Sequence, residues 1–256
     1  MADETLNATV ILRRDLNERL AIVRVAPQGW HLPVHEPGQF ATLGLPDPQG
    51  PGKFLRRVYS IASAPGADHD EFYIQLVRDG PFTTRLWHLA EGDALHLSPR
   101  ASGAFTLAGV PEGGDVVLLA TGTGLAPYVS MVRAFRGSGR LGRCVVVHGA
   151  RMAAELGYRA EFAHWAAEDR DVQYVPTVTR EPAGSGWDGA CGRIQALLLS
   201  GELERRAGLR LDPERCHVFL CGNPGLIDEL EKLLGTRGYR QWRKDGGGSL
   251  HFERWW

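Results

Sequence analysis

Residues 116–132 read VVLLATGTGLAPYVSMV, and this stretch decides the fold of the second half of the chain. It begins with five apolar residues in the pattern of a buried strand, continues with a glycine-rich turn at 121–127 and ends in residues typical of a helix. Glycine lets the backbone approach a pyrophosphate closely, and the unpaired N–H groups that begin a helix attract its negative charge. The stretch therefore predicts a dinucleotide-binding turn with the contact residues Thr121, Gly122, Thr123, Gly124 and Pro127.

Two departures from the common Gly-x-Gly-x-x-Gly pattern indicate which nucleotide fits. Pro127 stands where the third glycine is usual, and it suits the first helical turn because its missing N–H costs nothing there. The next strand, at 144–148, is closely followed by Arg151 rather than by the acidic residue that would hold a free ribose 2′-hydroxyl. Arg151, with Arg180 and Arg193 after later segments, favours a 2′-phosphate and so NADP over NAD. Each arginine taken alone is more typical of a solvated surface.

The composition excludes several other classes of protein. The chain has 29 Lys and Arg against 30 Asp and Glu in 256 residues, and this balance argues against nucleic-acid binding by bulk electrostatics. Its apolar runs are far shorter than the ~18 residues that a membrane span needs, and its acidic N-terminus lacks the features of a signal peptide. The four cysteines form no Cys-x-x-Cys pair, which excludes the usual zinc and iron–sulfur spacings. We therefore expect a soluble, cytoplasmic protein without a metal, nucleic-acid or membrane partner.

The two halves of the chain have different patterns. In the first half, short alternating or β-branched runs separated by turns predict an antiparallel barrel or sandwich, with strands at 9–12, 20–25, 39–43 and 72–77 and a short helix at 84–90. In the second half, alternating strands and helices predict a parallel sheet covered on both faces, with strands at 116–120, 144–148, 172–178 and 217–220 and helices at 127–136, 153–167 and 226–235. A Gly-rich hinge at 109–114 separates predicted domains 1–109 and 110–256.

The first half carries a second motif, Arg57-Val58-Tyr59-Ser60, after a loop rich in Pro and Gly. Further along the chain come Gly80-Pro81-Phe82-Thr83-Thr84, the 121–127 turn, Cys221-Gly222-Asn223-Pro224 and the C-terminal Glu253-Arg254-Trp255-Trp256. In this order and spacing the motifs resemble the ferredoxin–NADP reductase family, specifically its bacterial ferredoxin/flavodoxin reductases, over almost the whole length. The resemblance implies an antiparallel FAD-binding β-barrel followed by a Rossmann-like NADP-binding α/β domain.

The resemblance also implies which residues of the barrel contact FAD. Arg57 is implied to grip the FAD pyrophosphate through charge-assisted bonds, and Tyr59 to lie on the isoalloxazine ring. Ser60 is implied to hydrogen-bond near the reactive flavin nitrogen. The other implied FAD contacts are Val58, beside these residues, and Gly80, Thr83 and Thr84, at the phosphates.

The chain ends in two tryptophans, which would be unfavourable for solubility unless they cover a flat surface. The resemblance implies that Trp255 covers the isoalloxazine face opposite Tyr59 and that Trp256 covers the FAD adenine, and it leaves open which tryptophan takes which place. Glu253 matches an acidic residue placed near the nicotinamide and Ser60. This residue is therefore an implied member of the catalytic group.

On the nucleotide side, the resemblance implies that the 121–127 turn binds the NADP pyrophosphate and that the three arginines surround the 2′-phosphate. Cys221 is implied to lie where the nicotinamide reaches the flavin; without the resemblance it is a small buried residue at a strand end. No neighbouring His or Lys suggests a stabilised thiolate, so a nucleophilic role is not expected. The remaining implied NADP contacts are Gly222, Asn223 and Pro224. The nine histidines show no spacing that indicates a site.

The resemblance implies an FAD-dependent oxidoreductase that moves electrons between NADPH and a one-electron carrier, ferredoxin or flavodoxin, as a monomer. An arginine rim that steers such acidic carriers is expected from Arg56, Arg78, Arg85 and Arg254. Two alternatives stay open: an NADPH-dependent reductase component for an oxygenase or other acceptor, and a regulatory module that binds FAD or NADP without turnover. The lack of a four-cysteine cluster disfavours the first, and the joint presence of Ser60, Cys221 and Glu253 disfavours the second.

Overall fold

The computed structural model describes residues 5–50 and 52–254, and the chain falls into two compact units. The first unit comprises Met1–Thr106 with Val129–Ala134, and the second comprises Leu107–Tyr128 with Phe135–Trp256. Helix α2 (Ala126–Phe135) therefore contributes residues to both units. The boundary at 109/110 stays a prediction, because it concerns which cofactor each segment binds.

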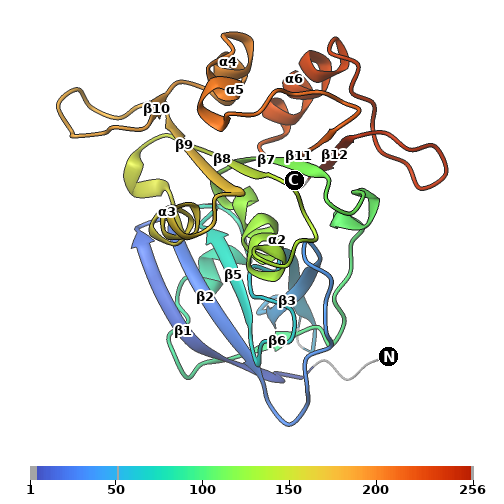
Figure 1. The fold of residues 1–256 in the computed structure, drawn as a ribbon. Helices are drawn as coiled ribbons and strands as arrows, with labels where there is room; N and C mark the ends of the chain where they lie inside the picture. The colour runs from blue at the N-terminus through green and yellow to red at the C-terminus, as the bar shows by residue number, and fades with distance from the viewer. Residues whose placement is uncertain (1–4, 51, 255–256) are drawn as a thin grey trace. The chain divides into compact units, whose positions relative to one another are not determined.

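The first unit is a closed antiparallel barrel (Figure 1). Its strands run in the order β4-β3-β6-β1-β2-β5, and each neighbouring pair is antiparallel. An antiparallel bridge between Ile61, just after β4, and Phe72 of β5 joins the two outer strands, so the sheet closes on itself. The elements are β1 (Ala8–Asn17), β2 (Leu20–Pro27), β3 (Phe40–Pro46), β4 (Phe54–Ser60), β5 (Asp70–Gln75), β6 (Ala94–Leu97) and the short helix α1 (Thr83–Leu86). The predicted antiparallel β-barrel is confirmed.

The barrel core follows from the alternation of side chains along each strand. Successive side chains of a strand point to opposite faces, so every second residue of the strands meets the others inside the barrel. Buried residues of this core include Val10, Val23, Leu43, Ile74 and Leu97.

The helix predicted at 84–90 is shorter in the structure. Helix α1 ends at Leu86, and the chain then turns toward β6. The Asp93 carboxylate accepts the Ala90 N–H at 2.7 Å, and Gly92 adopts a φ of +95°. A side chain and a glycine in the left-handed region thus provide the turn that replaces the last part of the expected helix.

The second unit is built on a parallel sheet with the strand order β10-β9-β8-β7-β11-β12, in which every neighbouring pair is parallel. Its strands are β7 (Asp115–Thr121), β8 (Cys144–Ala150), β9 (Val172–Val178), β10 (Ala190–Cys191), β11 (Cys216–Gly222) and β12 (Leu250–Arg254). Its other helices are α3 (Arg159–Glu168), α4 (Ile194–Leu199), α5 (Glu202–Ala207) and α6 (Pro224–Gly235), with 3₁₀ turns η1 (Leu107–Gly109), η2 (Gly122–Leu125) and η3 (Ala153–Glu155). The predicted Rossmann-like α/β fold is confirmed.

The helix predicted at 153–167 is interrupted near its start. The 3₁₀ turn η3 ends at Glu155, and α3 begins only at Arg159. Tyr158 lies between them with a φ of +61°, in the left-handed region that a right-handed helix cannot contain. The predicted helix is therefore a 3₁₀ turn followed by a shorter α-helix.

Helices cover both faces of the parallel sheet. Helices α4, α5 and α6 cover one face, and α3 lies on the other (Figure 1). The core of the first face joins strand residues such as Val117 and Val145 to Ile194 of α4, Leu203 of α5 and Leu230 of α6. Because all six strands are parallel, their carboxyl ends share one edge of the sheet, which we call the carboxyl edge. Within residues 5–50 and 52–254, no helix has the length and apolar character needed to cross a membrane.

Candidate functional site

The carboxyl edge of the sheet gathers most of the residues predicted to bind the nucleotide. Each of the six strands has at least one residue predicted to bind the nucleotide or to take part in catalysis at or close to its carboxyl end. In the order of the strands across the sheet, these residues include Arg193, Arg180, Arg151, Thr121, Gly222 and Glu253. Residues from distant parts of the sequence therefore meet along one edge, as the parallel topology requires.

The predicted dinucleotide-binding turn at 121–127 packs directly against the end of β11. A Cβ at Gly124 would lie 2.6 Å from the Cys221 carbonyl oxygen and 2.7 Å from the Gly222 Cα. A Cβ at Gly222 would lie 2.5 Å from the Thr121 Oγ1, and Gly222 has a φ of +126°, which residues with side chains rarely adopt. We call residues 121–124 and 221–224 the backbone cradle. At Gly124 and Gly222 no side chain fits, so the turn packs closely against the end of β11. Glycines at these two positions suit a turn whose backbone approaches a pyrophosphate closely.

Two helices begin at the backbone cradle. Helix α2 has Pro127 in its first turn, and α6 begins at Pro224 with Asn223 as its N-cap, accepting the Leu226 N–H at 3.3 Å. The Asn223 N–H donates to the Thr121 Oγ1 at 3.1 Å and so joins the two sides of the cradle. Since β7 and β11 are neighbours, both helix starts lie at the same part of the edge, where their N–H groups favour an anion.

The loops after β8 and β9 are joined through their backbones. The Arg180 N–H donates to the Arg151 carbonyl oxygen at 2.7 Å, so these two predicted residues lie close together. The Arg151 guanidinium binds Glu155 through an Nη2–Oε1 contact of 2.7 Å and an Nε–Oε2 contact of 3.2 Å. Glu155 also accepts the Arg151 N–H at 3.1 Å, so one carboxylate orients both the backbone and the side chain of Arg151.

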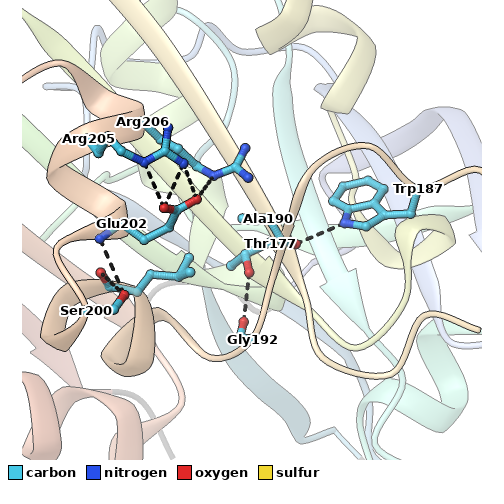
Figure 2. Close-up of polar contacts among 9 residues, drawn as sticks. Thr177, Trp187, Ala190, Gly192, Ser200, Glu202, Arg205 and Arg206 are labelled. Carbon is cyan, nitrogen blue, oxygen red and sulfur yellow. Dashed lines mark hydrogen bonds and ion pairs between the residues drawn. The ribbon is translucent and has the colours of Figure 1, made fainter. Parts of the chain in front are cut away.

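The third predicted arginine is placed by a buried hydroxyl. Thr177, which is fully buried, donates from Oγ1 to the Gly192 carbonyl oxygen at 2.7 Å (Figure 2). This bond fixes the residue directly before Arg193, which is the N-cap of α4. The Trp187 Nε1 donates to the Ala190 carbonyl oxygen at 2.9 Å and secures the loop that leads into β10 (Figure 2).

Two further arginines in the same view are bound to a carboxylate of their own helix. Arg205 and Arg206 of α5 both bind Glu202, each with a nitrogen–oxygen distance of 2.6 Å (Figure 2). Pairs at this spacing stabilise a helix by a few tenths of a kcal/mol. The Arg143 side chain, just before β8, donates to the Ala207 carbonyl oxygen at 2.9 Å, so α5 ends toward the amino ends of the strands. Because the two arginines lie on this helix and not on a loop of the carboxyl edge, we assign neither to the nucleotide.

Cys221 and Glu253 are paired in register on β11 and β12. Cys221 is buried, and burial together with the charge of Glu253 raises the pKa of its thiol. The thiol is therefore neutral near pH 7, in agreement with the expectation that it is not a nucleophile. Arg254, which was expected in an arginine rim, binds Asp228 at 3.1 Å and Glu231 at 2.6 Å, so its charge is compensated within the second unit.

The motif predicted at 57–60 lies on β4 of the barrel and is paired with β3. Its first two residues are exposed, whereas Tyr59 is half-buried and its ring packs against Phe72 and Phe82 at centroid distances of 6.3 Å and 6.1 Å. Burial raises the pKa of Tyr59, although the nearby Arg57 opposes the shift, so the hydroxyl keeps its proton. A guanidinium beside an aromatic ring with a neutral hydroxyl suits the diphosphate and ring of a flavin nucleotide.

The turn before α1 uses its own hydroxyl groups. The Thr83 Oγ1 donates to the Val77 carbonyl oxygen at 3.0 Å and accepts the Val77 N–H at 3.1 Å. The Thr84 Oγ1 donates to the Gly80 carbonyl oxygen at 2.8 Å. Both hydroxyl hydrogens are thus bound within the turn. While these hydroxyl bonds remain intact, a phosphate at this turn can bind backbone N–H groups but not the hydroxyl hydrogens of Thr83 and Thr84. The predicted phosphate contacts of these two residues are therefore reduced to their backbone.

Sequence reasoning missed a buried charge network that contacts the chain just after β4. Glu71, whose side chain is 1% exposed, binds Arg24 at 2.6 Å and Arg133 at 2.7 Å. Burial alone would raise the pKa of Glu71, but the two guanidinium groups together hold it below its ordinary value. Arg133 also donates to the Ala62 carbonyl oxygen at 2.9 Å. The network therefore holds the chain just beyond the motif.

A set of hydroxyl contacts continues this support. The Ser130 Oγ donates to the Ser63 carbonyl oxygen at 2.7 Å, and the His35 Nε2 lies 3.3 Å from the same Oγ. The Ser63 Oγ accepts the Glu71 N–H at 3.2 Å. These contacts join residues 8 to 95 positions apart, and only the shortest of them lies within reach of a local sequence pattern.

A buried histidine that sequence reasoning missed lies beside the turn at 121–127. His148 was assigned no role, yet it is fully buried with its Nε2 3.1 Å from the Gly122 carbonyl oxygen of the phosphate turn. Its partner lies 26 residues away in the sequence, so no local spacing pointed to it. Trp255 and Trp256 lie outside the described residues, and their roles stay predictions.

Comparison with known proteins agrees with this geometry. Residues 118–232 match the family described as the oxidoreductase NAD-binding domain. A ferredoxin–NADP reductase of Azotobacter vinelandii is 34% identical over 215 residues, which are 80% of this chain and 80% of that protein. A flavodoxin/ferredoxin–NADP reductase of Escherichia coli K12 is 35% identical over 206 residues, covering 78% of this chain and 81% of that protein.

The fold is also similar to a solved structure. A crystal structure of a ferredoxin NADP+ reductase from Neisseria gonorrhoeae with bound FAD and NADP matches with a TM-score of 0.88 at 26% identity. The match covers 99% of both chains. The likeness therefore extends over both units.

Proposed function

This chain belongs to the ferredoxin–NADP reductase family, and we propose that it moves electrons between NADPH and a ferredoxin or flavodoxin through a bound FAD. The observation that carries the proposal is the backbone cradle, where Gly124 and Gly222 have no room for a side chain and where two helices begin. A bound FAD would supply the exchange between a hydride and single electrons, a chemistry that no side chain supplies. The polypeptide supplies binding, orientation and charge.

Residues 110–256 bind NADP in this proposal. The backbone cradle and the starts of α2 and α6 hold the pyrophosphate, because they present N–H groups to negative charge. Arg151, Arg180 and Arg193 hold the 2′-phosphate, for which a guanidinium fork is suited. Support comes from the bond between the loops of Arg151 and Arg180 and from the buried Thr177 that fixes the residue before Arg193.

Residues 1–109 bind FAD in this proposal. Arg57 binds the pyrophosphate, Val58 and Tyr59 contact the flavin, and backbone N–H groups around Gly80 contact the phosphates. The seat of the Tyr59 ring on Phe72 supports this arrangement, since it gives the tyrosine a fixed orientation. The hydroxyls of Thr83 and Thr84 act mainly by shaping the turn.

Three side chains act at the reacting ends of the cofactors. Ser60 orients the flavin by a hydrogen bond near its reactive nitrogen. Cys221 contacts the nicotinamide as a neutral thiol, since its raised pKa keeps the thiol protonated, and Glu253 lies beside it in register on β12. The two C-terminal tryptophans cover the flavin and its adenine, so their removal should change both the flavin absorbance spectrum and the affinity for NADP+.

The proposal is tested with purified protein and its bound flavin. FAD content is measured first, followed by the rates of reduction of a one-electron dye with NADPH and with NADH. Rates with a ferredoxin and a flavodoxin then identify the acceptor. We expect bound FAD, a preference for NADPH, and reduction of at least one of the two carriers.

Other outcomes would support the alternatives. Reduction of the dye without reduction of either carrier would indicate a reductase component for another acceptor. A flavin-containing protein inert to NADPH would indicate a regulatory module. The proposal also includes a monomer that works in the cytoplasm, and sedimentation and cell fractionation check these two points.

A further inference from the structure

The side chain of His148, on the central strand β8, contacts both the turn at 121–127 and Tyr174 of the neighbouring strand β9. His148 pairs in register with Ala120 of β7 and Pro176 of β9, and it is fully buried. Its Nε2 lies 3.1 Å from the carbonyl oxygen of Gly122, the first residue of η2. Its Nδ1 lies 3.4 Å from the Tyr174 hydroxyl. Burying an imidazole costs desolvation free energy that the valines of β8 do not cost, so these two contacts must offset it.

The chemistry of the two partners decides which ring nitrogen of His148 carries hydrogen. Burial lowers the pKa of His148 to about 4, so the ring is neutral near pH 7 and has a single N–H. A carbonyl oxygen can only accept, so Nε2 carries the hydrogen and donates to Gly122. Nδ1 is then an acceptor for the Tyr174 hydroxyl. The three groups form one directed chain of hydrogen bonds from Tyr174 to Gly122.

This chain fixes the orientation of one peptide group in the turn. The peptide between Gly122 and Thr123 is planar and trans, so its carbonyl and its N–H point in opposite directions. With the carbonyl oxygen drawn toward His148, the Thr123 N–H points away from the sheet interior. Gly122 has a φ of +54°, and a peptide next to glycine rotates readily unless a bond restrains it.

We propose that His148 is a positioning residue for the nucleotide, which by holding the Gly122 carbonyl oxygen aims the Thr123 N–H at the pyrophosphate. The proposal rests on the proposed NADP site at the backbone cradle. His148 acts through Gly122 and does not touch the ligand itself. The Tyr174 hydroxyl supports it by keeping the hydrogen on Nε2.

The test compares two ligands on the FAD-loaded protein by calorimetric titration. NADP+ contains both the pyrophosphate and the 2′-phosphate, whereas adenosine 2′-monophosphate contains only the 2′-phosphate. His148→Leu removes the donor, and it should raise the dissociation constant of NADP+ about tenfold while changing that of adenosine 2′-monophosphate by less than about twofold. His148→Gln, whose side-chain amide can donate to Gly122, should restore much of the NADP+ affinity.

Two further variants serve as controls. Tyr174→Phe keeps the imidazole and the packing, and should weaken NADP+ about threefold with no change for adenosine 2′-monophosphate. It also keeps the test decisive if His148→Leu folds poorly. Thr177→Val removes the matching buried donor on the arginine side, at Gly192, and should weaken both ligands to a similar extent.

The possible outcomes separate this inference from the function on which it rests. Equal weakening of both ligands by His148→Leu would show a general structural role and overturn the inference. Unchanged NADP+ affinity in both His148→Leu and Tyr174→Phe would overturn it as well. Failure of the unaltered protein to bind NADP+ would instead refute the proposed function.

Discussion

The two units build their candidate sites from different parts of the polypeptide. At the carboxyl edge of the sheet, the main chain itself forms the cradle, and Gly124 and Gly222 leave no space for a side chain. On the barrel, the side chains of β4 form the candidate surface, and the charge network of Glu71 binds the chain just after β4 at Ala62. The backbone cradle therefore requires that these two positions carry no side chain, whereas the β4 surface requires that the charge network keeps its side chains in place. We therefore expect added side chains to impair the backbone cradle, and loss of the Glu71 network to impair the barrel site.

The largest expected effect is in the support of the barrel. Glu71→Ala removes the buried carboxylate that binds both Arg24 and Arg133, and should lower the free energy of unfolding by about 3–5 kcal/mol. Chemical denaturation at pH 7, followed with FAD release, measures this loss. The exposed Glu18→Ala is the matched control. A loss no greater than in the control would show that the network does not support the barrel.

The same network predicts a dependence on pH. Because the folded-state pKa of Glu71 lies below its ordinary value, its stabilising contribution is present above that ordinary value and is lost as pH falls through the lowered pKa. The difference in stability between the unaltered protein and Glu71→Gln should therefore narrow on acidification. A constant difference across that pH range would contradict the assignment.

Obstruction of the backbone cradle is the next largest effect. Gly124→Ala places a Cβ 2.6 Å from the Cys221 carbonyl oxygen, and the turn must shift to relieve the contact. We expect the dissociation constant of NADP+ to rise about 100-fold, which corresponds to about 2.7 kcal/mol, with FAD content unchanged. Gly235→Ala in α6, where a Cβ meets nothing within 4 Å, should leave both unchanged. Loss of FAD from Gly124→Ala would contradict the expectation that this substitution impairs only the site of the second unit.

The 2′-phosphate site is expected to respond less strongly. Arg151→Ala removes one of three guanidinium groups, and should raise the KM for NADPH about 10- to 30-fold while leaving NADH nearly unchanged. Steady-state rates with both coenzymes measure this split. Arg205→Ala, whose partner is Glu202 on its own helix, is the control and should affect neither coenzyme. Equal losses with NADPH and NADH would contradict the 2′-phosphate role of Arg151.

The smallest effect concerns a buried carboxyl beside Glu71. Burial raises the pKa of Asp70 to about 6, so the folded protein keeps a proton that the unfolded chain releases, and stability falls as pH rises toward 6. Asp70→Asn cannot ionise, and should stabilise the barrel on the order of 1 kcal/mol at pH 8 and very little at pH 4. Melting temperatures at the two pH values test this. An equal gain at both would mean that ionisation of Asp70 is not the cause.

Features encoded locally were predictable from the sequence. The strand, glycine turn and Pro127 at 116–127 specify a nucleotide turn without knowledge of the rest of the chain, because strand pattern, glycine and proline each restrict the backbone directly. Once the second half is read as a parallel sheet, the topology alone brings Arg151, Arg180 and Arg193 to one edge. The two-domain fold and the family followed from the same motifs.

Features that depend on distant partners were not predictable. Glu71 binds Arg133 across 62 residues, and His148 meets Gly122 across 26. Neither pair shares a spacing that secondary structure would reveal. The hydroxyl bonds of Thr83 fall in a different class, because they are local but depend on turn geometry that the sequence GPFTT does not specify. These roles follow from which polar side chains are buried and which partners they meet in the fold, and neither can be read from composition.

The membership of helix α2 in both units has a consequence for dissecting the protein. A gene cut at the apparent linker near residue 109 would yield a barrel fragment without Val129–Ala134. In that fragment Glu71 would lose one of its two guanidinium partners, and the carbonyl groups of Ala62 and Ser63 would lose their donors. The two halves of the sequence are therefore not independent domains that can be separated at one point in the chain. A chimera that borrows the barrel must also import the middle of a helix encoded in the other half.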